Sequence, residues 1–105
     1  MFGLSDSTIS LINEIFSKCS GIEKVLIYGS RARGDYRNGS DIDLTIIGDI
    51  SFDDKMRISG QIDDLPIPYM CDLSILREIR NENLIEHIGR VGQIFYEKIP
   101  GVLLN

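Results

Sequence analysis

The sequence is poor in the side chains from which zinc sites and disulfide frameworks are built. Its 105 residues include two cysteines and one histidine. Cys19 and Cys71 lie far apart and no CxxC pair occurs, so neither a zinc site nor a disulfide-stabilised scaffold is expected. Free cysteines are commonly buried, and this pattern favours two reduced thiols in a cytoplasmic protein.

Long apolar runs and an excess of positive charge are also missing. No stretch approaches the roughly 20 residues of a membrane-spanning helix, and the first residues lack the basic and apolar segments of a signal peptide. The formal net charge of −5 disfavours binding along a nucleic-acid backbone. Against this acidic background, Arg31, Arg33 and Arg37 form a local basic cluster, which could hold a few phosphates but not a duplex.

Helical and strand patterns alternate along the chain. Ser5 or Ser7 caps the first predicted helix, Ser51 opens a capping box for the second, and Gly89 or Gly92 ends the third. We expect helices at about 5–19, 51–63 and 83–90, strands at 25–28, 41–47, 69–75 and 93–97, and a helical turn with a loop at 31–40. This order predicts one α+β (α/β-like) domain, residues 1–105, with a small mixed β-sheet and helices packed on one face.

Three aspartates are expected on one face of that sheet. Asp41 and Asp43 are two positions apart in an alternating strand, so their side chains leave the same face. Asp72 lies on a strand whose other face is apolar. If the apolar faces of both strands meet the helices, the three carboxylates share the uncovered face. Carboxylates at close range repel one another, and such an oxygen-rich group suits Mg²⁺ or Mn²⁺.

A phosphate-binding turn is expected just before these carboxylates. Gly29 and Ser30 follow a buried strand, and there glycine permits close backbone approach while amide and hydroxyl groups bind phosphate oxygens. Arg31 and Arg33 come next. A phosphate cradle followed by a metal-binding strand is typical of phosphoryl or nucleotidyl transfer with two metal ions.

The same residues carry a family resemblance. Gly29-Ser30, ten residues, and then Asp41-Ile42-Asp43 look like the signature of the DNA polymerase beta-like nucleotidyltransferase superfamily. The fuller string G-S-R-A-R-G-D-Y-R-N-G-S-D-I-D-L resembles its minimal nucleotidyltransferase (MNT) branch. The resemblance covers about residues 23–76, and the whole chain has the length of such a domain.

The resemblance implies a nucleotidyltransferase fold, two Mg²⁺ ions (or Mn²⁺) and ATP as the substrate. By this resemblance Asp72 completes the metal site and helps to deprotonate the acceptor. The implied metal-binding and catalytic residues are Asp41, Asp43 and Asp72, and the implied nucleotide- and phosphate-binding residues are Gly29, Ser30 and Arg33.

The implied function is that of an antitoxin. Many MNT proteins pair with a HEPN-domain toxin, and in one arrangement they transfer AMP from ATP to a tyrosine of that partner. A small chain without an acceptor lobe fits this interpretation. Two alternatives stay open: a non-catalytic antitoxin that neutralises its partner by binding, and a small-molecule, aminoglycoside-type nucleotidyltransferase. The nucleotide, the acceptor, the number of nucleotides transferred and the homo- or hetero-oligomeric state are left open.

Simpler interpretations compete for individual residues. An isolated D-x-D is weak, because motifs this short occur by chance. Charged runs such as Arg31 to Arg37 are often merely solvated. We interpret His87, beside Ile88 on a predicted helix, as a surface or packing residue, since no second base accompanies it. Tyr28 is interpreted as a core residue.

Overall fold

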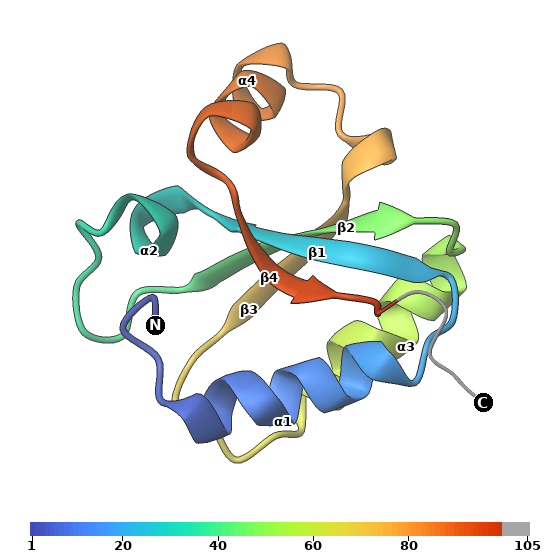
Figure 1. The fold of residues 1–105 in the computed structure, drawn as a ribbon, viewed down its shortest axis with the longest axis horizontal. Coiled ribbons are helices and arrows are strands. Elements are labelled where there is room, and N and C mark those ends of the chain that lie inside the picture. The colour runs from blue at the N-terminus through green and yellow to red at the C-terminus, as the bar shows by residue number, and fades with distance from the viewer. Residues whose placement is uncertain (100–105) are drawn as a thin grey trace.

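The computed structural model describes residues 1–99, and within that range all of the predicted helices and strands are present. In chain order the elements are α1 (Asp6–Ser17), β1 (Ile22–Tyr28), α2 (Gly29–Arg33), β2 (Ile42–Gly48), α3 (Phe52–Asp63), β3 (Cys71–Ile75), the 3-10 helix η1 (Leu76–Glu78), α4 (Glu82–Val91) and β4 (Gln93–Glu97) (Figure 1). Over residues 1–99 no helix has the length and apolar character that a bilayer crossing demands.

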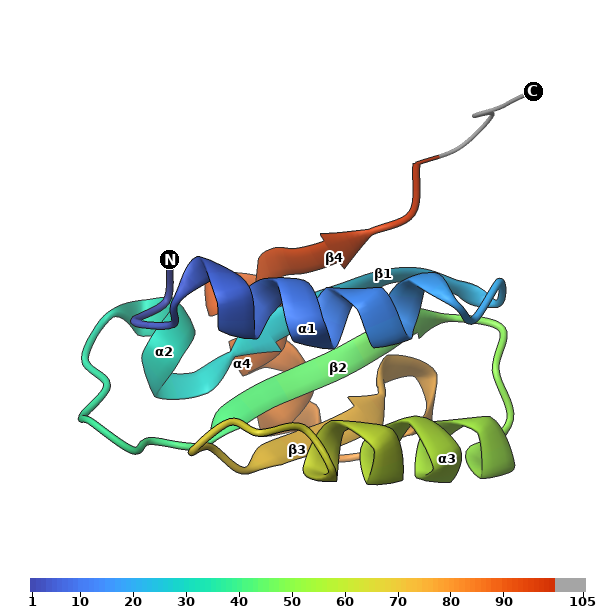
Figure 2. The same ribbon diagram turned by 90° about the horizontal axis from the view of Figure 1, so that it is seen from below.

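The strands form one mixed sheet in the order β3-β2-β1-β4. β2 runs parallel to β3, while β1 is antiparallel to both β2 and β4. α1 and α3 cover one face of the sheet (Figure 2), and α4 lies on the opposite side (Figure 1). The predicted α+β class and mixed sheet are confirmed. α4 differs from the expectation that the helices pack on one face, because it packs beside α2 and β1 on the other side.

Alternating apolar residues explain why α1 and α3 pack on that face. Most of the side chains that β1, β2 and β3 direct toward the helices are apolar and buried, and the helices add their own apolar stripes. The residues of this core include Val25, Ile27, Leu44, Ile46, Leu73 and Ile75 from the sheet, and Ile12, Phe16, Ile58 and Ile62 from the helices. Each such burial contributes about 1.5–3 kcal/mol, which fixes the facing of the strands.

Helix caps follow the sequence closely. Ser5 caps α1, and Ser51 forms a capping box at α3. α4 ends at Gly92, while Gly89 lies inside the helix. One boundary matters for the site: the first β2 residue is Ile42, whose N–H donates to the Met70 carbonyl at 2.9 Å. Asp41 therefore precedes the strand instead of opening it.

Candidate nucleotide and metal site

Two of the three predicted aspartates are direct neighbours across parallel strands. Asp43 of β2 is paired in register with Asp72 of β3, on the face turned away from α1 and α3. Burial raises the pKa of Asp43 above its usual range, and the charges of Asp72 and Asp41 raise that pKa further. The carboxylates therefore repel one another in the protein alone, as the strand pattern predicts.

Asp41 lies in the loop in front of β2 and does not join the paired aspartates in one compact cluster. It is exposed, and its charge acts on Asp43. Within residues 1–99, no three His, Cys, Asp or Glu side chains converge into a ready-made cage for a metal ion. Mg²⁺ is usually held by one or two carboxylates together with waters and substrate phosphates, so it needs no such cage. The mutual repulsion around Asp43 and the all-oxygen donor set fit a divalent cation of this kind.

Gly29 brings the backbone of the next element against the carboxylates. Its φ is +74°, a left-handed conformation that favours glycine. A Cβ at this position would collide with Oδ2 of Asp43. The turn into α2 thus lies directly on Asp43, with Ser30 as the second residue of the helix. The turn in which phosphate-binding amides are expected is therefore adjacent to Asp43, one of the expected metal ligands.

His87 of α4 lies at this turn as well. The Gly29 N–H donates to His87 Nε2 at 3.2 Å, so this ring nitrogen is the acceptor. The imidazole also packs edge-on against the Tyr28 ring, with centroids 6.2 Å apart. The contact with Tyr28 agrees with the interpretation of His87 as a packing residue. The hydrogen bond from Gly29 was not predicted. Nothing in the local sequence indicates the contact with Gly29, because only the return of α4 over the sheet creates it.

Tyr28 of β1 is the direct neighbour of Asp43 across the two antiparallel strands. It is buried at the end of β1, opposite Asp43 in the β1–β2 ladder. Burial raises its pKa and a hydrogen bond with Ser74 lowers it, while the charges of Asp43 and Asp72 raise it again. Ser74 in turn donates to Thr45 Oγ1 at 2.9 Å. The predicted core role of Tyr28 is confirmed.

Comparison with known proteins agrees with this geometry. Residues 11–100 match the model of the family described as polymerase beta, nucleotidyltransferase. The chain belongs to the polymerase beta nucleotidyltransferase family. A protein of Methanocaldococcus jannaschii named "Putative protein adenylyltransferase" is 51% identical to it over 43 residues. This match covers 40% of the present chain and 43% of the relative, so it spans less than half of either protein.

Solved structures share the fold at low identity. One is a crystal structure of a toxin–antitoxin with AMP-PNP, with a TM-score of 0.69 and 15% identity over 90% of this chain and 75% of that one. Another is the tri-AMPylated Shewanella oneidensis HEPN toxin in complex with its MNT antitoxin, with a TM-score of 0.66 and 12% identity over 90% and 74% of the two chains. They establish that this nucleotidyltransferase chain has the fold of those structures.

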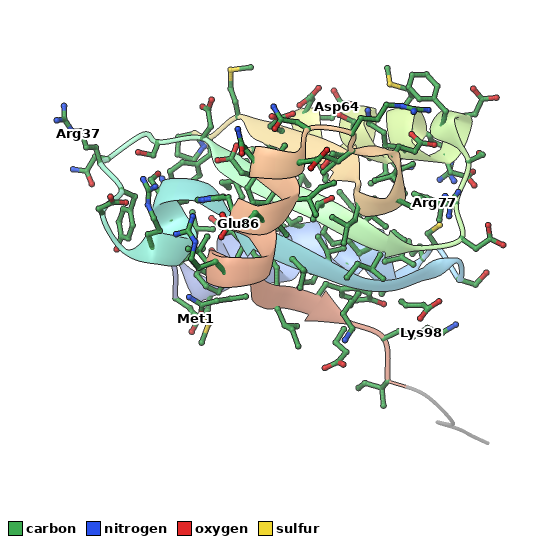
Figure 3. All side chains as sticks on the ribbon, turned by 90° about the horizontal axis from the view of Figure 1, so that it is seen from above. Met1, Arg37, Asp64, Arg77, Glu86 and Lys98 are labelled. Carbon is green, nitrogen blue, oxygen red and sulfur yellow. The ribbon has the colours of Figure 1, made fainter. Side chains whose placement is uncertain are left out.

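The three arginines that follow the Gly29-Ser30 turn do not form one cluster. Arg31 is buried, and all of its hydrogen bonds go to backbone carbonyls. Arg33 is exposed and forms an ion pair with Asp35 at 3.3 Å. Arg37 projects from the outer end of the loop, as Figure 3 shows. The expectation that three arginines face phosphates together is therefore wrong for Arg31, whose guanidinium points into the protein.

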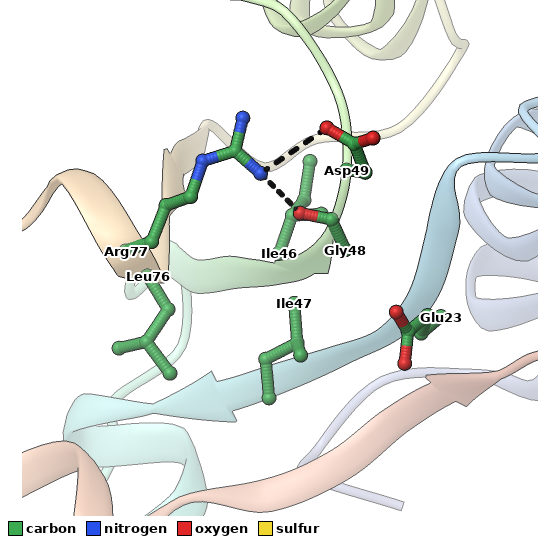
Figure 4. Close-up of a pocket in the computed structure, with 7 residues that line it drawn as sticks. All are labelled: Glu23, Ile46, Ile47, Gly48, Asp49, Leu76 and Arg77. Atoms are coloured by element: carbon green, nitrogen blue, oxygen red, sulfur yellow. Dashed lines mark hydrogen bonds and ion pairs between the residues drawn. The ribbon is translucent and has the colours of Figure 1, made fainter.

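A separate pocket lies at the other end of β2, where the strand leaves the sheet. Its lining residues are Glu23, Ile46, Ile47, Gly48, Asp49, Leu76 and Arg77 (Figure 4). Arg77 donates to the Gly48 carbonyl and pairs with Asp49 at 3.8 Å. The pocket contains none of the predicted site residues, because Asp43 and Gly29 lie at the opposite end of the β1–β2 ladder.

Proposed function

We propose that this protein is a Mg²⁺-dependent adenylyltransferase that acts as an antitoxin by transferring AMP from ATP to a tyrosine of a HEPN-type toxin. The observation that carries the proposal is the pairing of Asp43 with Asp72 beside Gly29. A divalent cation and a triphosphate need neighbouring groups of these two kinds.

In this proposal Asp41, Asp43 and Asp72 hold the metal, which when bound neutralises negative charge on the triphosphate and on the acceptor oxygen. Gly29 and Ser30 bind the β- and γ-phosphates through the amide and hydroxyl groups at the start of α2. The acceptor oxygen forms a bond to the α-phosphorus, the bond from that phosphorus to the β-phosphate oxygen breaks, and pyrophosphate leaves. Asp72, the exposed member of the paired aspartates, takes the acceptor proton.

The Gly29 N–H already has a hydrogen-bond partner, with which a bound phosphate would compete. His87 Nε2 accepts the Gly29 N–H, which is a group that we assign to phosphate. A phosphate oxygen and the imidazole nitrogen cannot both take this N–H along the same direction. Nucleotide binding at this amide therefore requires the His87 side chain to give way.

The nature of the acceptor is supported by the kind of protein that resembles this chain. The M. jannaschii relative is named as a protein adenylyltransferase, and a structure of the same fold is a HEPN toxin carrying AMP with its MNT antitoxin. The exposed position of Asp72 fits a macromolecular acceptor, because a side chain of another protein can reach it from solvent.

Label transfer tests the proposal directly. The purified protein is incubated with Mg²⁺, ATP labelled at the α-phosphate, and the product of the neighbouring gene. We expect label on the partner with the wild type, and none with an Asp41→Asn/Asp43→Asn variant. Asp49→Asn is the matched control, since it removes an exposed aspartate at the other end of β2.

Three outcomes would count against parts of the proposal. Label from γ-labelled ATP, in place of α-labelled ATP, would indicate a kinase. Label that persists after every tyrosine of the partner is changed to phenylalanine would exclude tyrosine as the acceptor. If the double variant still protects cells from the partner, binding alone neutralises it and the catalytic hypothesis is overturned.

A further inference from the structure

Arg31 is a buried cation whose side chain is wholly engaged with the backbone. Its exposed fraction is 3%. Nε and Nη2 both donate to the Ser40 carbonyl, at 3.0 and 2.9 Å, and Nη1 donates to the Phe2 carbonyl at 2.9 Å. Among residues 1–99 no carboxylate lies within ion-pair distance of it.

Two aromatic rings replace the missing counter-ion. The guanidinium lies over the Tyr69 ring at 4.8 Å and over the Tyr36 ring at 5.1 Å from the centroids. Cation–π contacts of this kind are strongest when the cation is desolvated. Arginine is suited to the position because its flat fork both stacks on rings and donates in several fixed directions, which lysine cannot reproduce.

The main target of this fork is the peptide group in front of Asp41. The Ser40 carbonyl belongs to the same rigid plane as the Asp41 nitrogen and Cα. On the other side of Asp41, the Ile42 N–H is bonded to the Met70 carbonyl at 2.9 Å. Asp41 is therefore held between two anchors, one given by the sheet and the other by Arg31.

We propose that Arg31 is a positioning residue, which orients Asp41 for metal and nucleotide binding by holding the Ser40–Asp41 peptide. Arg31 follows Ser30 in α2, so the same short helix that presents Gly29 and Ser30 also fixes the loop that carries Asp41. The phosphate-binding turn and the outlying carboxylate are thereby joined into one unit. This inference rests on the proposed function, because it takes Asp41 as a metal ligand.

The test measures Mn²⁺ affinity by calorimetry in the presence of a non-hydrolysable ATP analogue, together with the melting temperature of each variant. We expect Arg31→Met to weaken Mn²⁺ binding by about tenfold, which is typical when a group that orients a ligand is removed. Asp41→Asn is expected to weaken binding by at least as much. In the Asp41→Asn background Arg31→Met should have no further effect, since both changes act through the same carboxylate.

Matched variants distinguish the geometric role of Arg31 from its charge and from its effect on protein stability. Arg31→Lys keeps the charge and loses the fork, so it should bind Mn²⁺ as weakly as Arg31→Met. Full affinity in Arg31→Lys would overturn the proposal. Arg77→Met removes an arginine that also donates to two backbone carbonyls, those of Gly48 and Ile50, and should leave Mn²⁺ affinity unchanged.

The remaining outcomes distinguish this inference from the proposed function. Equal Mn²⁺ binding by the wild type and Asp41→Asn would refute the metal assignment itself. Weak binding by Asp41→Asn with full affinity in Arg31→Met would refute only the role of Arg31. If Arg31→Met does not fold, Arg31→Gln keeps part of the apolar stem and an amide donor, and a loss of affinity in the same direction is expected.

Discussion

The candidate site has two halves that are held by different physical means. Asp43 and Asp72 sit inside the β2–β3 ladder, where backbone pairing and a buried apolar layer fix them. Asp41 and the Gly29 turn lie outside any strand, and side-chain contacts from Arg31 and His87 hold them. The sheet-held half is therefore set by the fold, whereas the loop-held half depends on a few individual contacts. Substitutions in the two halves should have different consequences.

The largest effect is expected in the sheet-held half. Asp43→Asn removes the carboxylate that is nearest to both Asp72 and Gly29, and should lower AMP transfer by about 10³-fold or more, equivalent to about 4 kcal/mol. Because the β2–β3 pairing does not involve this side chain, far-UV circular dichroism should be unchanged. Transfer of α-labelled AMP measures the effect beside the Asp49→Asn control. A loss below tenfold would show that Asp43 is dispensable.

Gly29→Ala tests how closely the two halves fit together. The substitution places a Cβ against Asp43 Oδ2 at a φ of +74°, so we expect about 100-fold lower transfer and a lower melting temperature. Gly34→Ala is a matched control, because Gly34 has a φ of +93° and open space around its Cβ. Both variants carry the backbone strain, and only the first carries the collision. Equal activity loss in both would mean that contact with Asp43 is irrelevant.

A smaller effect is expected from His87 in the loop-held half. His87→Ala frees the Gly29 N–H, so a non-hydrolysable ATP analogue should bind several-fold more tightly, as one hydrogen bond is worth about 0.5–1.5 kcal/mol. His87→Gln, whose amide oxygen can accept the same bond, should stay close to the wild type. Titration calorimetry measures the affinity of both variants for the analogue. Weaker binding by His87→Ala would show that the imidazole supports the phosphate site.

The facing of Asp43 and Asp72 was predictable from the sequence for a definite reason. The period of a strand is two, so the apolar residues around Asp43 and Asp72 determine which way these side chains face. The Gly29-Ser30 turn was equally visible, because a glycine directly after a buried strand indicates a turn or a close approach of the backbone to a neighbour. The register that sets Asp43 opposite Asp72 was not predictable, because parity fixes the face and not the alignment.

The loop-held half shows why the remainder could not be predicted from the sequence. Arg31 and Arg33 are two positions apart in the same basic run, yet one is buried against Tyr36 and Tyr69 and the other is exposed. Only the tertiary placement of the two rings distinguishes them. His87 likewise meets Gly29 across a sequence separation of 58 residues. Residue type and spacing carry no information about contacts of this kind.

The smallest predicted effect concerns stability and returns to Asp43. Burial and the charges of Asp72 and Asp41 raise its pKa in the folded protein, so the ionised carboxylate is less favourable there than in the unfolded chain. This penalty is fully present above the folded-state pKa and is lost as the pH falls through it. Without metal, Asp43→Asn should therefore melt about 1–4 °C higher than the wild type at pH 7, a small shift because the group is partly solvated.

The difference in melting temperature between Asp43→Asn and the wild type should depend on pH and on bound metal. The advantage of Asp43→Asn should shrink as the pH is lowered through the raised pKa of the wild-type carboxyl, because protonation removes the charge that burial and the neighbouring aspartates disfavour. Asp49→Asn, at the exposed end of β2, should give no such gain. Thermal unfolding from pH 4 to 8 in a chelator measures both, and a lower melting temperature for Asp43→Asn at pH 7 would contradict the prediction. Mg²⁺ with nucleotide should stabilise the wild type more than Asp43→Asn, because a bound cation removes the repulsion that the sheet imposes on its two paired aspartates.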